Sequence, residues 1–222
     1  MISKVRETIQ QIPSWVFIVQ LFIGLGWLRA GVEKMISIDW WTGEYLRDFV
    51  AESAPLTLGW YEPFLDWVVL PAAPLVAAFV MFSQFAIAFG LLTNKRVGAA
   101  LGLGMFLNLH FIAAGAVTPS AFYLLSQGAL ALWLAERSTK RETRHALEAT
   151  AVSGAALAIA HVPWIETLEP AEVIHDPAIM LATAGGIAAL GCGLARERIR
   201  AGVAKAEVVR SEPAVRPESV VF

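Results

Sequence analysis

The stretch VVLPAAPLVAAFVMFSQFAIAFGLL, Val68–Leu92, contains no charged side chain in 25 residues. A helix needs about 20 mostly apolar residues to cross the hydrocarbon core of a bilayer, so this stretch predicts a membrane-spanning helix. Further apolar stretches lie on either side of it in the sequence: Ser14–Met35, Val97–Ala116, Pro119–Ala135, Ala149–Trp164 and Ala178–Ala195. The sequence therefore predicts an all-α membrane protein with about six transmembrane spans.

The composition of the whole chain favours the same class. Of its 222 residues, 57% are hydrophobic and 16% are charged, whereas soluble domains carry about 25% charged residues. One soluble core of this length could not bury so much apolar surface, so the lipid bilayer is the expected partner. The charges are segregated along the chain and form no single basic surface, which excludes a nucleic-acid-binding protein.

The order of basic and acidic segments predicts the topology. The basic clusters are Lys4 and Arg6, Lys95 and Arg96, Arg137–Arg144, and the tail from Arg196 onward. The acidic segments are Asp39–Asp66 and Glu166–Asp176. Lys and Arg in short loops stay in the cytoplasm, so this alternation predicts six spans with both termini inside. Four spans with two re-entrant segments are the alternative.

Three parts are expected along the chain. Residues 1–136 predict an antiparallel four-helix membrane core with an outer loop over 37–67, and residues 146–195 predict an added transmembrane hairpin. Residues 196–222 predict a disordered cytoplasmic tail. Within the outer loop, apolar residues at helical spacing predict a short surface helix that ends before Pro55. In the third span, Gly98, Gly102 and Gly104, with Ala100, predict a small-residue face for close helix contact.

Ionisable side chains inside a membrane helix are costly and mark candidate sites. Arg29 and Glu33 are four residues apart, so they share a helix face and can pair. Counting about 1.5 Å per residue places His110 and Tyr123 at the depth of Arg29. These four residues are expected to meet in one buried pocket if their helices are neighbours. A purely structural Arg29–Glu33 ion pair is the alternative.

Three amides have a simpler interpretation, because amides often form hydrogen bonds between membrane helices. They are Gln84, Asn108 and Gln127. The single cysteine, Cys192, excludes an internal disulfide or a CxxC redox pair. No two histidines share a depth suited to haem, and the sequence has no GxGxxG, P-loop or HExxH motif. No haem, flavin or metal site is therefore expected.

Three motifs carry a resemblance to a known family. They are Gly26-Trp-Leu-Arg-Ala-Gly-Val-Glu-Lys34, Phe89-Gly-Leu-Leu-Thr-Asn-Lys-Arg96 and Asn108-Leu-His-Phe-Ile-Ala-Ala-Gly115. Together they resemble the DoxX-like membrane proteins. The long Trp-rich outer loop is most similar to the DoxD group, the membrane subunit of thiosulfate:quinone oxidoreductase. Two features depart from the family pattern: the fifth and sixth spans, and Gln84 where many relatives have an acidic residue.

The resemblance implies a multi-pass protein of the cytoplasmic (inner) membrane that serves a quinone-linked oxidoreductase. The expected electron donor is a reduced sulfur anion such as thiosulfate, bound by Arg29, Glu33 and Lys34. The expected quinone-binding residues are Asn108, His110 and Tyr123, while Gln84 and Gln127 are structural polar residues. A membrane or outer-side partner subunit would be needed, because the chain has no redox centre of its own.

Two other function classes stay open at this stage. The first is a non-catalytic membrane scaffold or assembly partner for a redox enzyme, with the outer loop as its docking surface. The second is a small-solute transporter, which the sequence favours less because it has no inverted repeat or pair of broken helices. Whether the chain is catalytic, and its oligomeric state, do not follow from the sequence.

Overall fold

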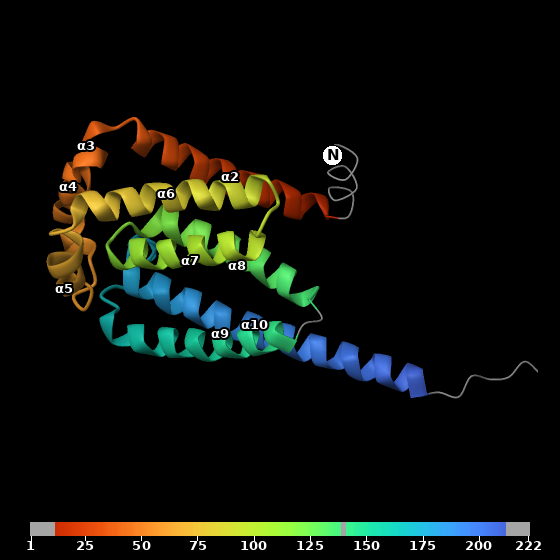
Figure 1. Ribbon diagram of the computed structural model, residues 1–222. Coiled ribbons are helices and arrows are strands. Elements are labelled where there is room, and N and C mark those ends of the chain that lie inside the picture. Colours follow the sequence, from red (N-terminus) through yellow and green to blue (C-terminus); the bar gives the residue numbers. More distant parts are fainter. Residues whose placement is uncertain (1–11, 139–140, 212–222) are drawn as a thin grey trace, which may run out of the picture.

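A computed structural model describes residues 12–138 and 141–211. In these residues every regular element is a helix, which confirms the predicted all-α class (Figure 1). The long helices are α2 (Ser14–Met35), α6 (Ala73–Leu92), α7 (Val97–Ala113), α8 (Val117–Glu136), α9 (Arg141–His161) and α10 (Pro177–Ser211). The short ones are α3 (Ile38–Thr42), α4 (Glu44–Ser53), η1 (Ala54–Leu56), α5 (Glu62–Phe64), η2 (Leu65–Val69) and η3 (Val162–Trp164).

Four helices in the described residues are long and apolar enough to cross a membrane. They are α2, α6, the segment Glu142–Trp164 that contains most of α9 and all of η3, and Pro177–Gly202 within α10. Helix α7 is also apolar but has 17 residues. Helix α8 has 20 residues, and its polar side chains include Tyr123 and Gln127. The chain is thus a multi-pass membrane protein.

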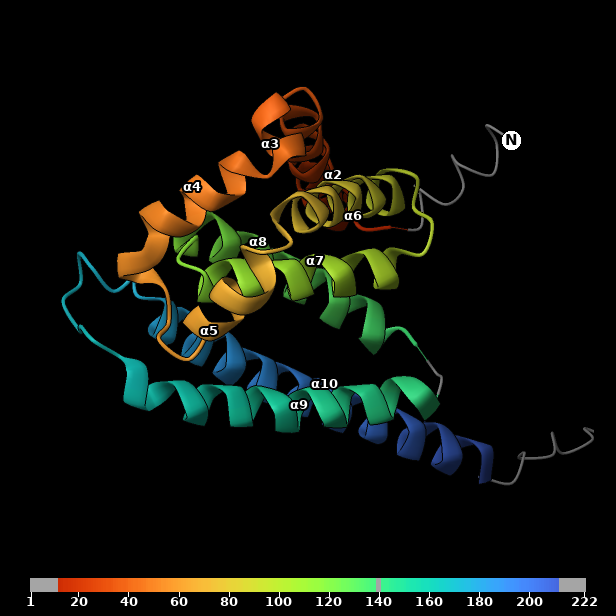
Figure 2. The ribbon, with the colours of Figure 1, turned by 60° about the vertical axis from the view of Figure 1, so that its left-hand side comes forward.

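The long helices pack in two groups. Helices α2, α6, α7 and α8 form a bundle in which α2 contacts α6 and α8, and α7 contacts α6 and α8. Helix α10 packs against α8 and α7, and α9 packs against α10, outside the bundle (Figures 1 and 2). Apolar side chains from α2, α6, α7 and α8, including Ile23, Ile87, Leu101 and Leu130, form a shared core.

The two ends of the molecule differ in charge. The end that holds the α6–α7 turn carries Lys95, Arg96 and Arg137, and we call it the basic end. The opposite end holds the short elements from α3 to η2, which we call the cap (residues 38–69). The acidic segments lie at this cap end. The predicted basic residues Lys4 and Arg6 lie outside the described residues.

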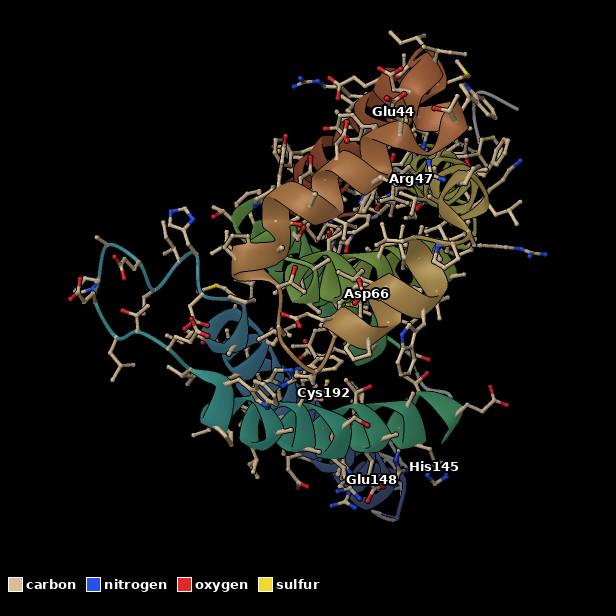
Figure 3. The ribbon with its side chains drawn as sticks, turned by 90° about the vertical axis from the view of Figure 1, so that its left-hand side faces the viewer. Glu44, Arg47, Asp66, His145, Glu148 and Cys192 are labelled. Carbon is tan, nitrogen blue, oxygen red and sulfur yellow. The ribbon has the colours of Figure 1, made fainter. Side chains whose placement is uncertain are left out.

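The cap is fixed to the ends of the bundle helices. The indole N–H of Trp40 donates to the carbonyl of Ala77 in α6 at 2.8 Å, and the Leu58 N–H donates to the Ala113 carbonyl of α7 at 3.1 Å. Gly43 joins α3 to α4 with φ +77°, and a Cβ there would lie 2.7 Å from the Pro74 nitrogen. Viewed end-on, α4 and the α5 segment lie across the bundle (Figure 3). The predicted surface helix before Pro55 is α4.

The α6–α7 connection is a tight hairpin. Asn94 and Arg96 have φ values of 55° and 53°, which close the turn. The side chain of Gln20 in α2 donates to the Leu91 carbonyl at 2.7 Å and so holds the turn against the bundle. A Cβ on Gly90 would lie 2.7 Å from the Ala100 Cβ, so α6 and α7 are in close contact at the basic end.

Glycines also bring α9 and α10 together. A Cβ on Gly185 would lie 2.5 Å from the Gly154 carbonyl oxygen, and one on Gly154 would lie 2.6 Å from the Gly185 oxygen. Such short distances mean that the two backbones touch. On its other side α10 packs against α8, where Leu132 contacts the position of Gly191.

Several predicted boundaries need correction, and the fifth helix begins at Arg141 rather than Ala149. The second span begins at Ala73 rather than Val68, because Leu65–Val69 form a separate π-helical turn and Pro74 lies in the first turn of α6. The predicted disordered tail is wrong for residues 196–211, which continue α10. Ion pairs hold the start of this extension: Arg196–Glu148 at 2.8 Å and Arg198–Glu136 at 3.1 Å. Residues 212–222 lie outside the described residues.

Candidate functional site

A cavity of about 570 Å³ lies under the cap, between α2, α6, α7 and α8. This volume falls within the range of about 300–1,000 Å³ typical of small-molecule sites. Its walls are mainly apolar, and many of the lining residues are aromatic: Trp27, Trp40, Tyr45, Phe49, Tyr61, Phe64, Phe79, Phe106, Phe111 and Tyr123. The polar lining residues are Lys34, Gln84, Asn108, His110 and Ser120. The cavity therefore suits an apolar ligand with a ring and a few polar atoms.

Two buried polar groups in the cavity wall have no hydrogen-bond partner within residues 12–138 and 141–211. The indole Nε1–H of Trp27 and the side-chain Oε1 of Gln84 are both unpaired, and the two residues are only 5% and 3% exposed. An unpaired buried donor or acceptor costs about 1–3 kcal/mol. A ligand that forms hydrogen bonds with Trp27 and Gln84 would explain why the protein itself provides no partner for these two groups.

His110 and Tyr61 form a polar pair at the boundary between α7 and the cap. Tyr61 Oη lies 2.8 Å from His110 Nδ1. Burial raises the pKa of Tyr61, so its phenol stays protonated at neutral pH. When the imidazole proton is on Nε2, the phenol donates to Nδ1 and leaves Nε2–H free to donate. The sequence indicated only an interfacial aromatic role for Tyr61, because its contact with α7 joins residues 49 positions apart.

Asn108 and Gln127 link α7 to α8. Asn108 Nδ2 donates to Gln127 Oε1 at 2.9 Å, and both residues are buried. The Gln127 amide lies directly over Gly104, where a Cβ would overlap it. Gln127 thus forms the expected bond between helices, and Asn108 makes the same bond while lining the cavity. Gln84 was predicted to be structural, yet its amide forms no hydrogen bond with the described residues and it lines the cavity.

Tyr123 reaches the cavity from α8. Its hydroxyl lies against Gly26 of α2, which leaves no room for a Cβ at that position. The Tyr123 ring stacks on Phe22 at 6.1 Å between centroids and meets the edge of Trp27 at 5.8 Å. These ring contacts fix Tyr123 between α2 and the cavity.

Arg29 and Glu33 do not belong to the cavity. Their side chains form the predicted ion pair, with Arg29 Nε 2.7 Å from Glu33 Oε1, but they are 81% and 56% exposed. The prediction that both join His110 and Tyr123 in one buried pocket is therefore wrong. Depth along a helix does not specify rotation about its axis, and α2 turns these two residues outward while Trp27 and Lys34 line the cavity.

Lys34 is the cationic residue of the cavity wall. Its ammonium lies 4.7 Å from the centroid of the Trp40 ring, a cation–π contact. In the described residues the Lys34 ammonium makes no ion pair, and the neighbouring Glu33 carboxylate pairs with Arg29. Of the residues predicted to bind a substrate anion, Lys34 alone lies with Asn108, His110 and Tyr123.

The other histidines lie away from the cavity. His161 is buried at the end of α9, where its Nδ1 donates to the Leu157 carbonyl at 2.8 Å, and Trp60 packs against its ring. His175 Nδ1 lies 3.2 Å from the Thr118 hydroxyl. Among the described residues, no group of three or more His, Cys, Asp or Glu side chains could hold a metal ion.

A comparison of the chain with protein-family models, curated proteins and solved structures finds no match. The cavity and its lining residues are therefore the basis for the proposed function.

Proposed function

We propose that the cavity binds a quinone and that the protein is the membrane subunit of a quinone-linked oxidoreductase. The observation that carries this proposal is an aromatic cavity whose wall holds an unpaired donor and an unpaired acceptor, at Trp27 and Gln84. A quinone carbonyl accepts from Trp27 Nε1–H or His110, and a quinol hydroxyl donates to Gln84 Oε1. Aromatic walls favour the flat ring. The DoxX-like motifs support the same activity.

The electron donor in this proposal is a reduced sulfur anion such as thiosulfate, oxidised with a partner subunit. Two thiosulfate anions form one new S–S bond and release two electrons. The quinone takes up these two electrons and two protons and leaves as the quinol. Lys34, a cation without an ion pair in the cavity wall, is the group in this chain that attracts the anion.

We expect the purified protein to retain quinone and to be stabilised against heat by an added short-chain quinone. A ligand that binds only the folded protein adds about 2.7 kcal/mol of stability at a hundred times its dissociation constant. The measurement is thermal unfolding in mild detergent with increasing quinone. The control is an alcohol with the same side chain and no quinone ring, which should give no shift.

The scaffold function remains a second candidate because apolar side chains are exposed on and beside the cap. Trp67, Ile38 and Trp41 are all exposed there, and they fit either the membrane interface or a docked protein. A protein that carries no quinone, shows no thermal shift and co-purifies with a stable partner would support this candidate against the quinone site.

We further propose six spans in the cytoplasmic membrane, with both termini inside. Support comes from the arrangement of α2, α6, α7, α8, α9 and α10 between a basic end and an acidic cap end. Helices α7 and α8 would then also cross the membrane, partly shielded from the lipid by the neighbouring helices.

Reporter fusions test this topology. Reporters placed after Arg96, after Arg137 and at Phe222 should all indicate the cytoplasm, whereas reporters at Glu52 and Glu169 should indicate the outer side. The reason is the retention of Lys and Arg in the cytoplasm. A cytoplasmic signal at Glu169 would contradict six spans and leave the α9–α10 hairpin on the inner side.

A further inference from the structure

The boundary between α6 and α7 changes along its length. At the basic end the helices touch, since a Cβ on Gly90 would lie 2.7 Å from the Ala100 Cβ. Toward the cap, the two helices form walls of the cavity instead. The α6–α7 hairpin is therefore in close contact at its turn and borders the cavity toward its cap end, and the two helices are neighbours in both views (Figures 1 and 2).

Two phenylalanines in these parts of α6 and α7 lie at matching depth. Phe79 is six residues from the start of α6 and Phe106 is seven residues from the end of α7, so both lie about 10 Å below the cap ends of their helices. Both line the cavity, yet they are 53% and 49% exposed. A side chain that bounds a cavity and is also half exposed marks the place where the cavity meets the surface.

The cap covers the other approach to the cavity and is held to the bundle by hydrogen bonds, although two of its own cavity-lining residues, Tyr45 and Phe64, are 54% and 41% exposed. Trp40 is buried and donates to the Ala77 carbonyl, and the backbone of Leu58 is bonded to the end of α7. Gly43 packs directly against Pro74 at the start of α6. A ligand that reaches the cavity between α6 and α7 leaves these contacts intact and passes the rings of Phe79 and Phe106.

We propose that the cavity is loaded sideways from the lipid, between Phe79 and Phe106, by an amphiphile with a ring headgroup and one apolar tail. The headgroup lies deeper, beside Gln84, which is five residues further along α6 than Phe79. The tail leaves between the two phenylalanine rings and remains in the bilayer. This inference rests on the proposed quinone site and adds the ligand class and its route.

The test uses a quinone with a decyl tail that carries a diazirine at its end. The protein in lipid nanodiscs is irradiated with this probe, with or without excess unlabelled quinone, and the labelled peptides are identified by mass spectrometry. We expect the probe to label residues next to Phe79 and Phe106, and we expect excess unlabelled quinone to abolish this labelling. Removable labelling on α4 or α9 would overturn the lateral route while supporting the quinone site. No removable labelling anywhere would overturn both.

A pair of variants tests the route without the probe. Phe79→Trp narrows the boundary, so release of the decyl quinone should slow about tenfold, while a quinone without a tail should be less affected. Phe82→Trp is the matched control, because Phe82 lies on the same helix and is 60% exposed but does not line the cavity. Equal release rates for both variants would contradict the lateral route.

Discussion

The double variant Trp27→Phe with Gln84→Leu is expected to bind the quinol about 100-fold more weakly than the unchanged protein. Each substitution keeps an apolar or aromatic side chain in the wall and removes one buried polar group. A quinol hydroxyl can accept from the Trp27 indole and donate to Gln84 Oε1, and a neutral hydrogen bond contributes about 1–1.5 kcal/mol, or roughly tenfold in affinity, so two lost bonds give this factor. Titration of the purified variant with a short-chain quinol under reducing conditions measures the change in affinity.

The same double variant should be at least as stable as the unchanged protein when no ligand is bound. Neither removed group has a hydrogen-bond partner in the described residues, so the substitutions relieve two buried unpaired groups. Gln20→Leu is the opposite control, because Gln20 lies outside the cavity and bonds the Leu91 carbonyl. It should unfold at a lower temperature and keep the quinol affinity. A double variant that loses stability and keeps its affinity would contradict the proposed site.

Gly185→Leu is expected to disrupt the packing of α9 on α10. The new side chain would overlap the Gly154 carbonyl and the backbone nitrogen of Ala158, which lies 2.7 Å from the Cβ position. Backbone atoms cannot yield as a flexible side chain does, so the helices must separate and stability should fall by about 3 kcal/mol or more. Thermal unfolding and the yield of folded protein in detergent measure the loss.

Gly186→Leu is the matched control for this variant. Gly186 is the next residue on α10, and a Cβ there would meet no atom within 4 Å. The change should alter the stability by no more than about 0.5 kcal/mol, as at other open surface positions. Similar losses in the two variants would show that the Gly154–Gly185 contact does not hold the hairpin together.

The positions of the long helices along the chain could be predicted because each contains a long apolar stretch, but several of their ends could not. Helix α2 has the predicted bounds, Ser14–Met35. The third helix ends at Ala113 rather than Ala116, since Gly115 adopts φ +93° and turns the chain. The segment after Ala195 is charged and has no apolar periodicity, so the sequence did not predict a helix there. Ion pairs from this segment to α8 and α9 support the helix in the structure.

The site was predicted only in part because sequence gives depth but not rotation. His110, Tyr123, Asn108 and Lys34 share the cavity, whereas Arg29 faces outward. In α7, Ala100 and Gly104 make the predicted close contacts, but Gly102 meets no neighbour within 4 Å. The roles of Trp27 and Tyr61 depend on contacts between distant elements, which periodicity within one helix does not specify.

The length of α10 has a consequence beyond the membrane. Its 35 residues extend over about 52 Å, while the hydrocarbon core is about 30 Å thick, so in the proposed topology roughly 20 Å of continuous helix would project past the lipid at the basic end. A reporter protein fused directly after Ser211 would then be held at that height and at a fixed angle about the helix axis. One residue inserted between Gly202 and Ser211 would raise the reporter by about 1.5 Å and rotate it by about 100°. The projecting segment would therefore set the orientation of the fused reporter as well as its distance from the lipid.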